Sequence, residues 1–138
     1  MATASVLALT CGLVACSGDD DESRALATSL PAVGGTTRVW ETSGTTAADG
    51  AAEQPDADVE VGEGVTGLVF QFDCTGRGSV SVSLDGAAGG GGNGECPTTD
   101  GSPARVFFEG EVAPGTHRAS VRTSGEVDWI ASIETQAR

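Results

Sequence analysis

The strongest pattern of apolar and polar positions runs from residue 68 to residue 84. On both sides of a glycine-containing stretch the two kinds of side chain alternate with a period of two, which is typical of β-strands with one buried face. A three-residue turn at 75–77 predicts a β-hairpin in which Cys74 continues the inward series and points into the core. The inward pairs of this hairpin are Phe72 with Val80, Phe70 with Val82, and Leu68 with Leu84.

Shorter alternating runs predict strands before and after this segment. Residues 36–42 form the expected first strand, and residues 57–61 an edge strand with acidic side chains outward, which discourages aggregation. A turn at Pro114-Gly115 pairs residues 108–112 with 117–121 and sets Glu111 opposite Arg118. Residues 126–134 form the last strand. The stretches 43–56 and 85–102 are expected to be long surface loops, and the glycine run at 89–94 to be mobile.

Together these elements predict the fold class. About seven short strands, turn signals near every tenth residue and no convincing amphipathic helix indicate an all-β, antiparallel β-sandwich of the jelly-roll or Ig-like type over residues 36–138. The expected core consists of the inward-facing apolar side chains Leu68, Phe70, Phe72, Val80, Val82, Leu84, Val106, Phe108, Val121, Val127, Trp129 and Ile133.

Charge narrows the range of partners. The 138 residues carry a net charge of −13, with 20 acids, seven arginines and no lysine. Clustered cations are needed to bind phosphates, so this composition argues against a nucleic-acid partner. The acids are densest in residues 17–64, where a solvated surface is the simplest interpretation.

The N-terminus resembles the export signal of a bacterial lipoprotein. Residues 1–15 are uncharged and largely apolar, and they are too short to cross a bilayer as a helix. They end in Leu13-Val14-Ala15-Cys16, which is similar to a lipobox, so we expect residues 1–15 to be a signal peptide and Cys16 to carry a lipid. Residues 16–35 are then the lipidated N-terminus and an acidic flexible tether. Cleavage followed by free secretion is the alternative.

Counting the cysteines predicts one disulfide. Cys11 leaves with the signal peptide and Cys16 is lipidated, so Cys74 and Cys96 remain as a pair in an oxidising exterior. Closing this loop stabilises the fold by roughly 3.4 kcal/mol on a chain-entropy estimate. A metal site is the less favoured alternative, because the chain has one histidine and no CxxC spacing.

Few residues are candidates for binding chemistry. Asp56, Asp58 and Glu60 share one face of the 57–61 strand and would form a cation site if they acted together, but solvated acids on an edge strand are the simpler interpretation. Trp40 is a candidate sugar-stacking platform or, more simply, a packing residue. His117 begins a strand and fits a capped or rim histidine better than a catalytic base. No nucleophile motif occurs, so we expect neither an enzyme nor a cofactor.

Three short motifs resemble a known group of proteins. They are Phe72-Asp73-Cys74-Thr75-Gly76-Arg77-Gly78, the later Cys96, and Val127-Asp128-Trp129. This pattern is similar to that of small uncharacterised lipoproteins and secreted proteins of actinobacteria, which share F-x-C-x-G-x-G, a second cysteine and V-x-W. The resemblance covers about half of the chain and implies a disulfide-stapled β domain on the cell envelope, with no activity to transfer.

The sequence therefore leads to a functional expectation. The chain is expected to be a non-enzymatic binding or structural domain on the outer face of the cell membrane, attached through its lipid. The alternative is a surface module that binds a carbohydrate or calcium through Trp40 or the acids at positions 56, 58 and 60.

Overall fold

The computed structural model describes residues 25–47, 56–86, 90–98 and 101–138, which form one antiparallel sheet of six strands. No α-helix occurs in these ranges, and accordingly none there could span a membrane. The predicted all-β, antiparallel class is confirmed. The strands are β1 (Thr37–Thr46), β2 (Ala57–Val61), β3 (Val65–Leu84), β4 (Gly91–Cys96), β5 (Ala104–Glu109) and β6 (Gly115–Ala137).

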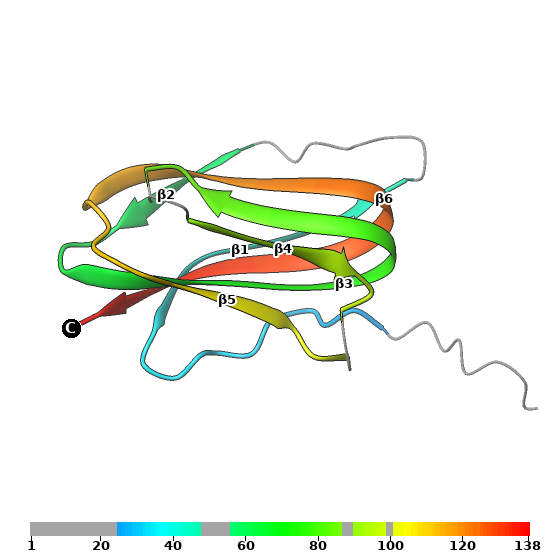
Figure 1. Ribbon diagram of the computed structural model, residues 1–138, viewed down its shortest axis with the longest axis horizontal. Coiled ribbons are helices and arrows are strands. Elements are labelled where there is room, and N and C mark those ends of the chain that lie inside the picture. The colour runs from blue at the N-terminus through cyan, green and yellow to red at the C-terminus, as the bar shows by residue number, and fades with distance from the viewer. Residues whose placement is uncertain (1–24, 48–55, 87–89, 99–100) are drawn as a thin grey trace, which may run out of the picture.

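Two long strands, β3 and β6, form the centre of the sheet. They pair antiparallel from Val65 opposite Ala137 to Leu84 opposite Ala119, which leaves out only residues 115–118 at the start of β6. In Figure 1 the two ribbons run side by side and curve together at one end of the molecule. The shorter strands add to the outer edges of this curved pair.

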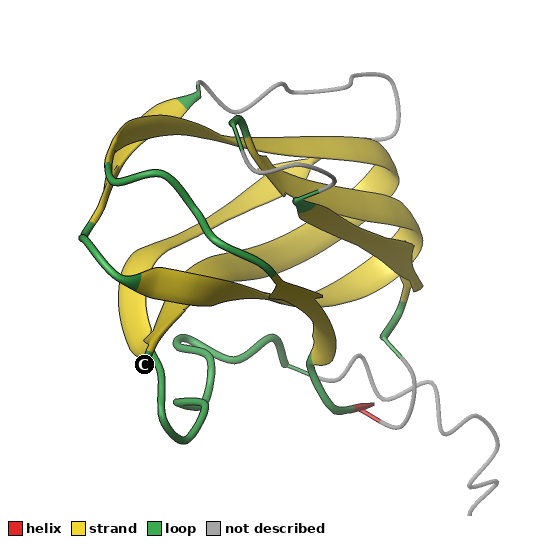
Figure 2. Cartoon of the chain, turned by 60° about the vertical axis from the view of Figure 1, so that its left-hand side comes forward, coloured by secondary structure: helices red, strands yellow, loops and turns green. Residues whose placement is uncertain are grey.

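The curve divides the sheet into two arms. In the first arm the strand order is β1, β6, β3, β5, and it uses the C-terminal half of β6 and the N-terminal half of β3. In the second arm the order is β2, β6, β3, β4, and it uses the other halves. Both arms contribute to one hydrophobic core, and the arrangement in Figure 2 is compatible with a sandwich made from a single folded sheet.

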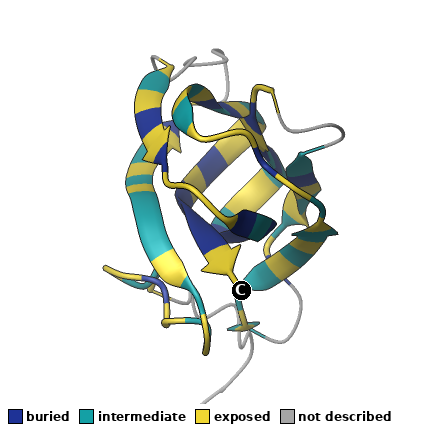
Figure 3. Cartoon of the chain, turned by 90° about the vertical axis from the view of Figure 1, so that its left-hand side faces the viewer, coloured by how far each residue is buried: buried dark blue, intermediate teal, exposed yellow. Residues whose placement is uncertain are grey.

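The buried face follows the predicted alternation. Figure 3 shows buried and exposed residues alternating along the strands. Trp129 and Phe70 are fully buried at the centre, and Val106 and Phe108 pack against the core from the edge strand β5. The predicted core residues are therefore confirmed.

The predicted hairpin at 75–77 is wrong. Residues 65–84 form one strand, and the glycine-containing stretch bends this strand without reversing it. Leu68, Phe70 and Phe72 lie in the first arm and Val80, Val82 and Leu84 in the second, so they share the core without being neighbours in the ladder. Alternation on both sides of a glycine is the same for a hairpin and for a bent strand, and pairing with the distant β6 decides between them.

Two further expectations about pairing are also wrong. Residues 85–102 are not one long loop, because Gly91–Cys96 form β4 and pair with residues 78–83 of β3. Residues 104–109 do not pair with 117–121. They pair with β3, whereas residues 115–119 pair with β2 and residues 119–121 pair with the end of β3. Residues 115–137 form one strand in which Gly125, opposite Gly78, lies at the bend.

The predicted disulfide between Cys74 and Cys96 is confirmed, with Cα atoms 5.5 Å apart. Cys74 lies in β3 just before the bend and is fully buried, and Cys96 ends β4 in the second arm. The bond therefore joins the two arms close to the place where the sheet bends.

Residues 25–36, which we call the N-terminal segment, are packed against the body. Leu30 is buried, and the Gln71 side-chain amide donates to the Pro31 carbonyl oxygen at 3.0 Å. The expectation of a flexible tether over 16–35 is thus corrected for 25–35, because this segment covers the outer face of the first arm. Gln71 and Glu134, which the alternation placed outward, are buried and both bond to this segment.

Candidate functional site

The acidic edge strand β2 has the orientation expected from its sequence. Asp58 and Glu60 are exposed, and the intervening Val59 is buried in the core. In the ladder with β6, Asp58 lies opposite Arg118 and Glu60 opposite Thr116. The Thr116 hydroxyl donates a hydrogen bond to Glu60. The two acids therefore face a cation and a donor on the neighbouring strand.

Asp56, just before β2, is also engaged by β6. Its Oδ1 accepts a hydrogen bond from the Ser120 hydroxyl at 2.7 Å and forms an ion pair with Arg122 Nη1 at 3.2 Å. The Ser120 hydrogen bond and then Arg122 lower the pKa of Asp56 below its ordinary value. The carboxylate is thus held in its charged form by protein groups.

Two of the three acids, Asp56 and Glu60, are thus held by side chains of β6. A calcium ion takes six to eight oxygen ligands, whereas these carboxylates lie at alternate positions in and just before β2, beside arginines and hydroxyl donors of β6. In the part of the chain that the structure describes, no group of three or more histidine, cysteine, aspartate or glutamate side chains could hold a metal ion. The acids therefore serve as polar and charged partners of β6 along its pairing with β2.

Trp40 is not brought together with the acids. It lies on β1 opposite Ile133, in the first arm, whereas β2 pairs with the other end of β6 in the second arm. Trp40 is partly buried and packs against the hydrophobic core. This position fits the packing role better than an open sugar-stacking platform.

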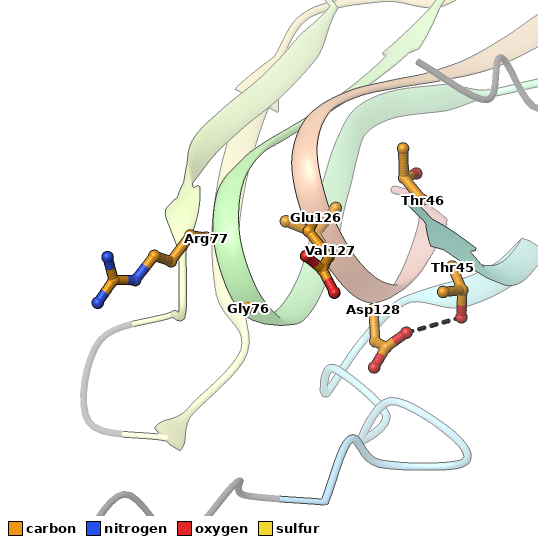
Figure 4. Close-up of a pocket in the computed structure, with 7 residues that line it drawn as sticks. All are labelled: Thr45, Thr46, Gly76, Arg77, Glu126, Val127 and Asp128. Atoms are coloured by element: carbon orange, nitrogen blue, oxygen red, sulfur yellow. Dashed lines mark hydrogen bonds between the residues drawn. The ribbon is translucent and has the colours of Figure 1, made fainter. Parts of the chain in front are cut away.

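A hollow at the bend was not predicted from the sequence. It has a volume of about 370 Å³ and collects residues from β1, β3 and β6. Thr45 Oγ1 donates to Asp128 Oδ1 at 2.7 Å, and Figure 4 shows the Arg77 side chain extending away from this pair. The residues that line the hollow are Thr45, Thr46, Gly76, Arg77, Glu126, Val127 and Asp128.

Sequence reasoning missed this hollow for a simple reason. Its walls come from segments about 30 to 80 residues apart, and they meet only because β3 and β6 bend together. Its lining combines two acids, two threonines and one arginine with a glycine and a valine. The hollow offers polar contacts to a ligand, but no group in it is arranged as a nucleophile with a base.

A second polar cluster lies beneath the N-terminal segment. Arg38 reaches Glu134 Oε1 at 2.8 Å and Glu41 Oε2 at 2.7 Å, and its guanidinium also donates to the carbonyl oxygens of Leu30 and Pro31. The Glu134 side chain is only 2% exposed and also accepts from the Val33 amide at 3.3 Å and from the Thr36 hydroxyl. Because a buried charge is costly unless it is paired, these contacts hold the segment in place.

His117 lies at the rim of the second arm and acts as a cap. Its Nδ1 is 2.8 Å from the Asp85 carbonyl oxygen, and its Nε2 is 2.6 Å from the Ala113 carbonyl oxygen. These two contacts, that with Ala113 first, raise the pKa of His117 above its ordinary value. Both ring nitrogens are occupied by backbone acceptors, so neither is presented to a substrate.

The remaining predicted site residue, Cys16, lies outside the described residues. Comparisons of the chain with protein-family models, with curated proteins and with solved structures found no match.

Proposed function

We propose that this chain is a lipid-anchored domain on the outer face of the cell membrane, where it serves as a non-enzymatic binding or structural module. The observation that carries the proposal is the buried disulfide between Cys74 and Cys96. Structural disulfides persist in oxidising compartments and are rare in the cytosol. An extracytoplasmic location is therefore the setting in which this core is stable.

The N-terminal sequence supports the anchor. Leu13-Val14-Ala15-Cys16 follows an uncharged apolar run and precedes an acidic stretch, which is the layout of a lipoprotein signal. The resemblance of the cysteine and tryptophan motifs to small actinobacterial lipoproteins supports the same proposal. The engaged acids of β2 and the packed Trp40 favour a binding or structural role over a calcium or sugar site at these residues.

Fractionation of the expressing cell tests the anchor. Wild-type protein is expected in the membrane fraction and to incorporate a clickable fatty-acid label, whereas Cys16→Ala loses the label and appears in the medium. Cys11→Ala is the matched control, because this cysteine belongs to the signal peptide and its loss leaves labelling intact. Equal labelling and fractionation of the wild type and Cys16→Ala would refute the proposal.

Ligand titration tests the alternative module. Calcium or cell-wall glycans added to the purified domain are expected to leave Trp fluorescence and melting temperature unchanged. Trp129 is buried and Trp40 partly exposed, so a ligand stacking on Trp40 would alter its emission. A saturable change that Trp40→Phe abolishes would favour the carbohydrate module instead.

A further inference from the structure

The edge strand β5 has one side without a strand partner. It pairs with β3 along residues 67–72, and within the described ranges no strand pairs with its other side. Figure 1 shows β5 as the last strand of the first arm. An open strand edge presents a row of backbone N–H and C=O groups to which another strand can add.

The ladder defines which backbone groups face this open side. The Gly110 amide donates to the Thr66 carbonyl oxygen at 3.0 Å, so residues 110 and 66 form a hydrogen-bonded pair. In an antiparallel ladder such pairs alternate with non-bonded ones, so residues 106 and 108 bond to β3. The N–H and C=O groups of Arg105, Phe107 and Glu109 therefore point to the open edge.

The same three residues also carry the exposed side chains of β5. Phe107 is 63% exposed, and it is the one large hydrophobic side chain that is exposed among the described residues. Arg105 and Glu109 flank it two positions away on the same face and are exposed as well. An aromatic side chain lies between a cation and an anion, directly above an unpartnered row of backbone donors and acceptors.

We propose that β5 pairs with β5 of a second copy of this chain, in an antiparallel arrangement centred on Phe107. A two-fold axis at this residue places the two Phe107 rings side by side. It also places each Arg105 opposite the Glu109 of the other copy, so the strand is complementary to itself in charge. The three outward residues of each strand provide about six backbone hydrogen bonds, and the two sheets join into one.

The other strand edges lack this self-complementarity. Pairing β2 with a second β2 would place Asp58 and Glu60 against acids. β1 has an irregular register between Arg38 and Trp40, and such irregularities interrupt pairing. β4 offers three glycines, an asparagine and a glutamate before Cys96, and hence no outward apolar side chain. The pattern of charge and exposure thus selects β5.

Sedimentation velocity over a concentration series tests the dimer. The sample is the full chain, secreted with the Cys16→Ala substitution, and with β5 otherwise unchanged it is expected to show a monomer–dimer equilibrium. Glu109→Arg sets arginines opposite one another, and we expect it to raise Kd at least about tenfold. Glu126→Arg makes the same charge change at the bend, far from β5, and should leave Kd unchanged.

A mixing experiment gives the sharper result. Arg105→Glu alone sets acids opposite one another and is expected to be monomeric. In a mixture of Arg105→Glu with Glu109→Arg, every charged position faces its opposite, so a one-to-one heterodimer forms. Circular dichroism and melting establish that each variant is folded, because Arg105 also donates to Gln71 at 2.7 Å. If Arg105→Glu fails to fold, Phe107→Lys replaces it as the second variant that abolishes the dimer.

Three results would overturn the proposal. One is a wild-type chain that stays monomeric up to about 1 mM. Another is a dimer that neither Glu109→Arg nor Phe107→Lys weakens, which would use a different surface. The third is a monomer whose β5 amides become protected only on adding a strand from an unrelated protein, which would assign the edge to a heterologous partner.

Discussion

His117 is the single histidine of the chain, and its surroundings favour one charge state. The carbonyl oxygens of Asp85 and Ala113 can only accept, so each ring nitrogen has to donate a proton. Neutral imidazole has one N–H and would leave one nitrogen lone pair facing a carbonyl lone pair. The nearby carboxylates of Asp85 and Glu60 also raise the pKa of His117 and so favour the protonated ring. His117 therefore joins the end of β3 to the start of β6 most strongly when it is protonated.

This contact predicts a pH-dependent stability. Because folding raises the pKa of His117, its contribution is complete below the ordinary value of 6.5 and is lost as pH rises through the folded value. The melting temperature should fall by about a few degrees between about pH 6 and pH 9. The chain has no lysine or tyrosine, so few other side chains titrate in this window.

The variant His117→Gln isolates this effect. It is expected to melt at a lower temperature at acidic pH and to show a flatter pH profile than the wild type. An NMR titration of the single histidine ring gives the folded pKa directly. A folded pKa at or below 6.5 would contradict the proposed contact.

Two glycines at the bend show how a single residue shapes an element. Gly76 has a φ of +92° and Gly125 a φ of +75°, and a residue with a side chain would be strained in either conformation. A methyl group at position 76 would lie 2.2 Å from the Glu126 carbonyl oxygen, and one at position 125 would lie 2.2 Å from the Arg77 carbonyl oxygen. The long strands can therefore curve together because each presents only backbone to the other at this point.

We predict that Gly76→Ala and Gly125→Ala each lower the free energy of unfolding by at least about 3 kcal/mol. Gly62→Ala is the matched control, because a methyl group there meets no atom within 4 Å. It should change stability by no more than about 0.5 kcal/mol. Urea denaturation measures all three, and a mild effect at both bend positions would show that the curve does not depend on these glycines.

The N-terminal segment is a second element whose role can be measured. Leu30 is 3% exposed and is its one buried apolar side chain, next to the polar cluster of Arg38 and Glu134. Leu30→Ala is expected to lower the free energy of unfolding by about 2 kcal/mol and to expose the segment to proteolysis. Leu26→Ala, at a half-buried position of the same segment, should have a smaller effect.

These elements show which parts of the fold could be predicted from the sequence. Alternation in 68–74 and 79–84 identified the inward face, the core and the inward Cys74, because burial imposes a period of two on any strand. It could not distinguish a turn from a bend at Gly76, since that depends on the distant partner β6. β4 was missed because its glycines have no side chains to alternate. These glycines are instead required by close packing, because a methyl group at Gly94 would lie 2.9 Å from the Phe72 ring.

The candidate sites, too, could be predicted where they depend on local spacing and not where they depend on distant partners. Local spacing placed Asp58 and Glu60 outward correctly, but the residues opposite them, Arg118 and Thr116, come from a strand more than 50 residues away. The N-terminal segment has no periodicity, so its packing on the first arm depends on polar contacts that a pattern does not reveal. The hollow at the bend arises from the tertiary fold alone.

For the molecule as a whole, the disulfide holds the two arms together at the bend. We predict that reduction lowers the free energy of unfolding by about 3 kcal/mol and the melting temperature accordingly. The double variant with Cys74→Ala and Cys96→Ala should reproduce this loss and be insensitive to reductant. Full alkylation of both cysteines in the unreduced native protein would show that the bond is absent.

The pairing of β3 with β6 also governs the order in which the chain can assemble. Each paired residue of β3 has its partner in β6 35 to 72 positions further along the chain, and β1 and β2 also pair with β6. As the polypeptide emerges from a ribosome or an export channel, β4 and β5 can already pair with β3, but β1 and β2 have no partner and β3 lacks its longest one until β6 has appeared. A nascent chain stalled before residue 115 would therefore be open to chaperones and proteases, and closure would come as one late, cooperative event.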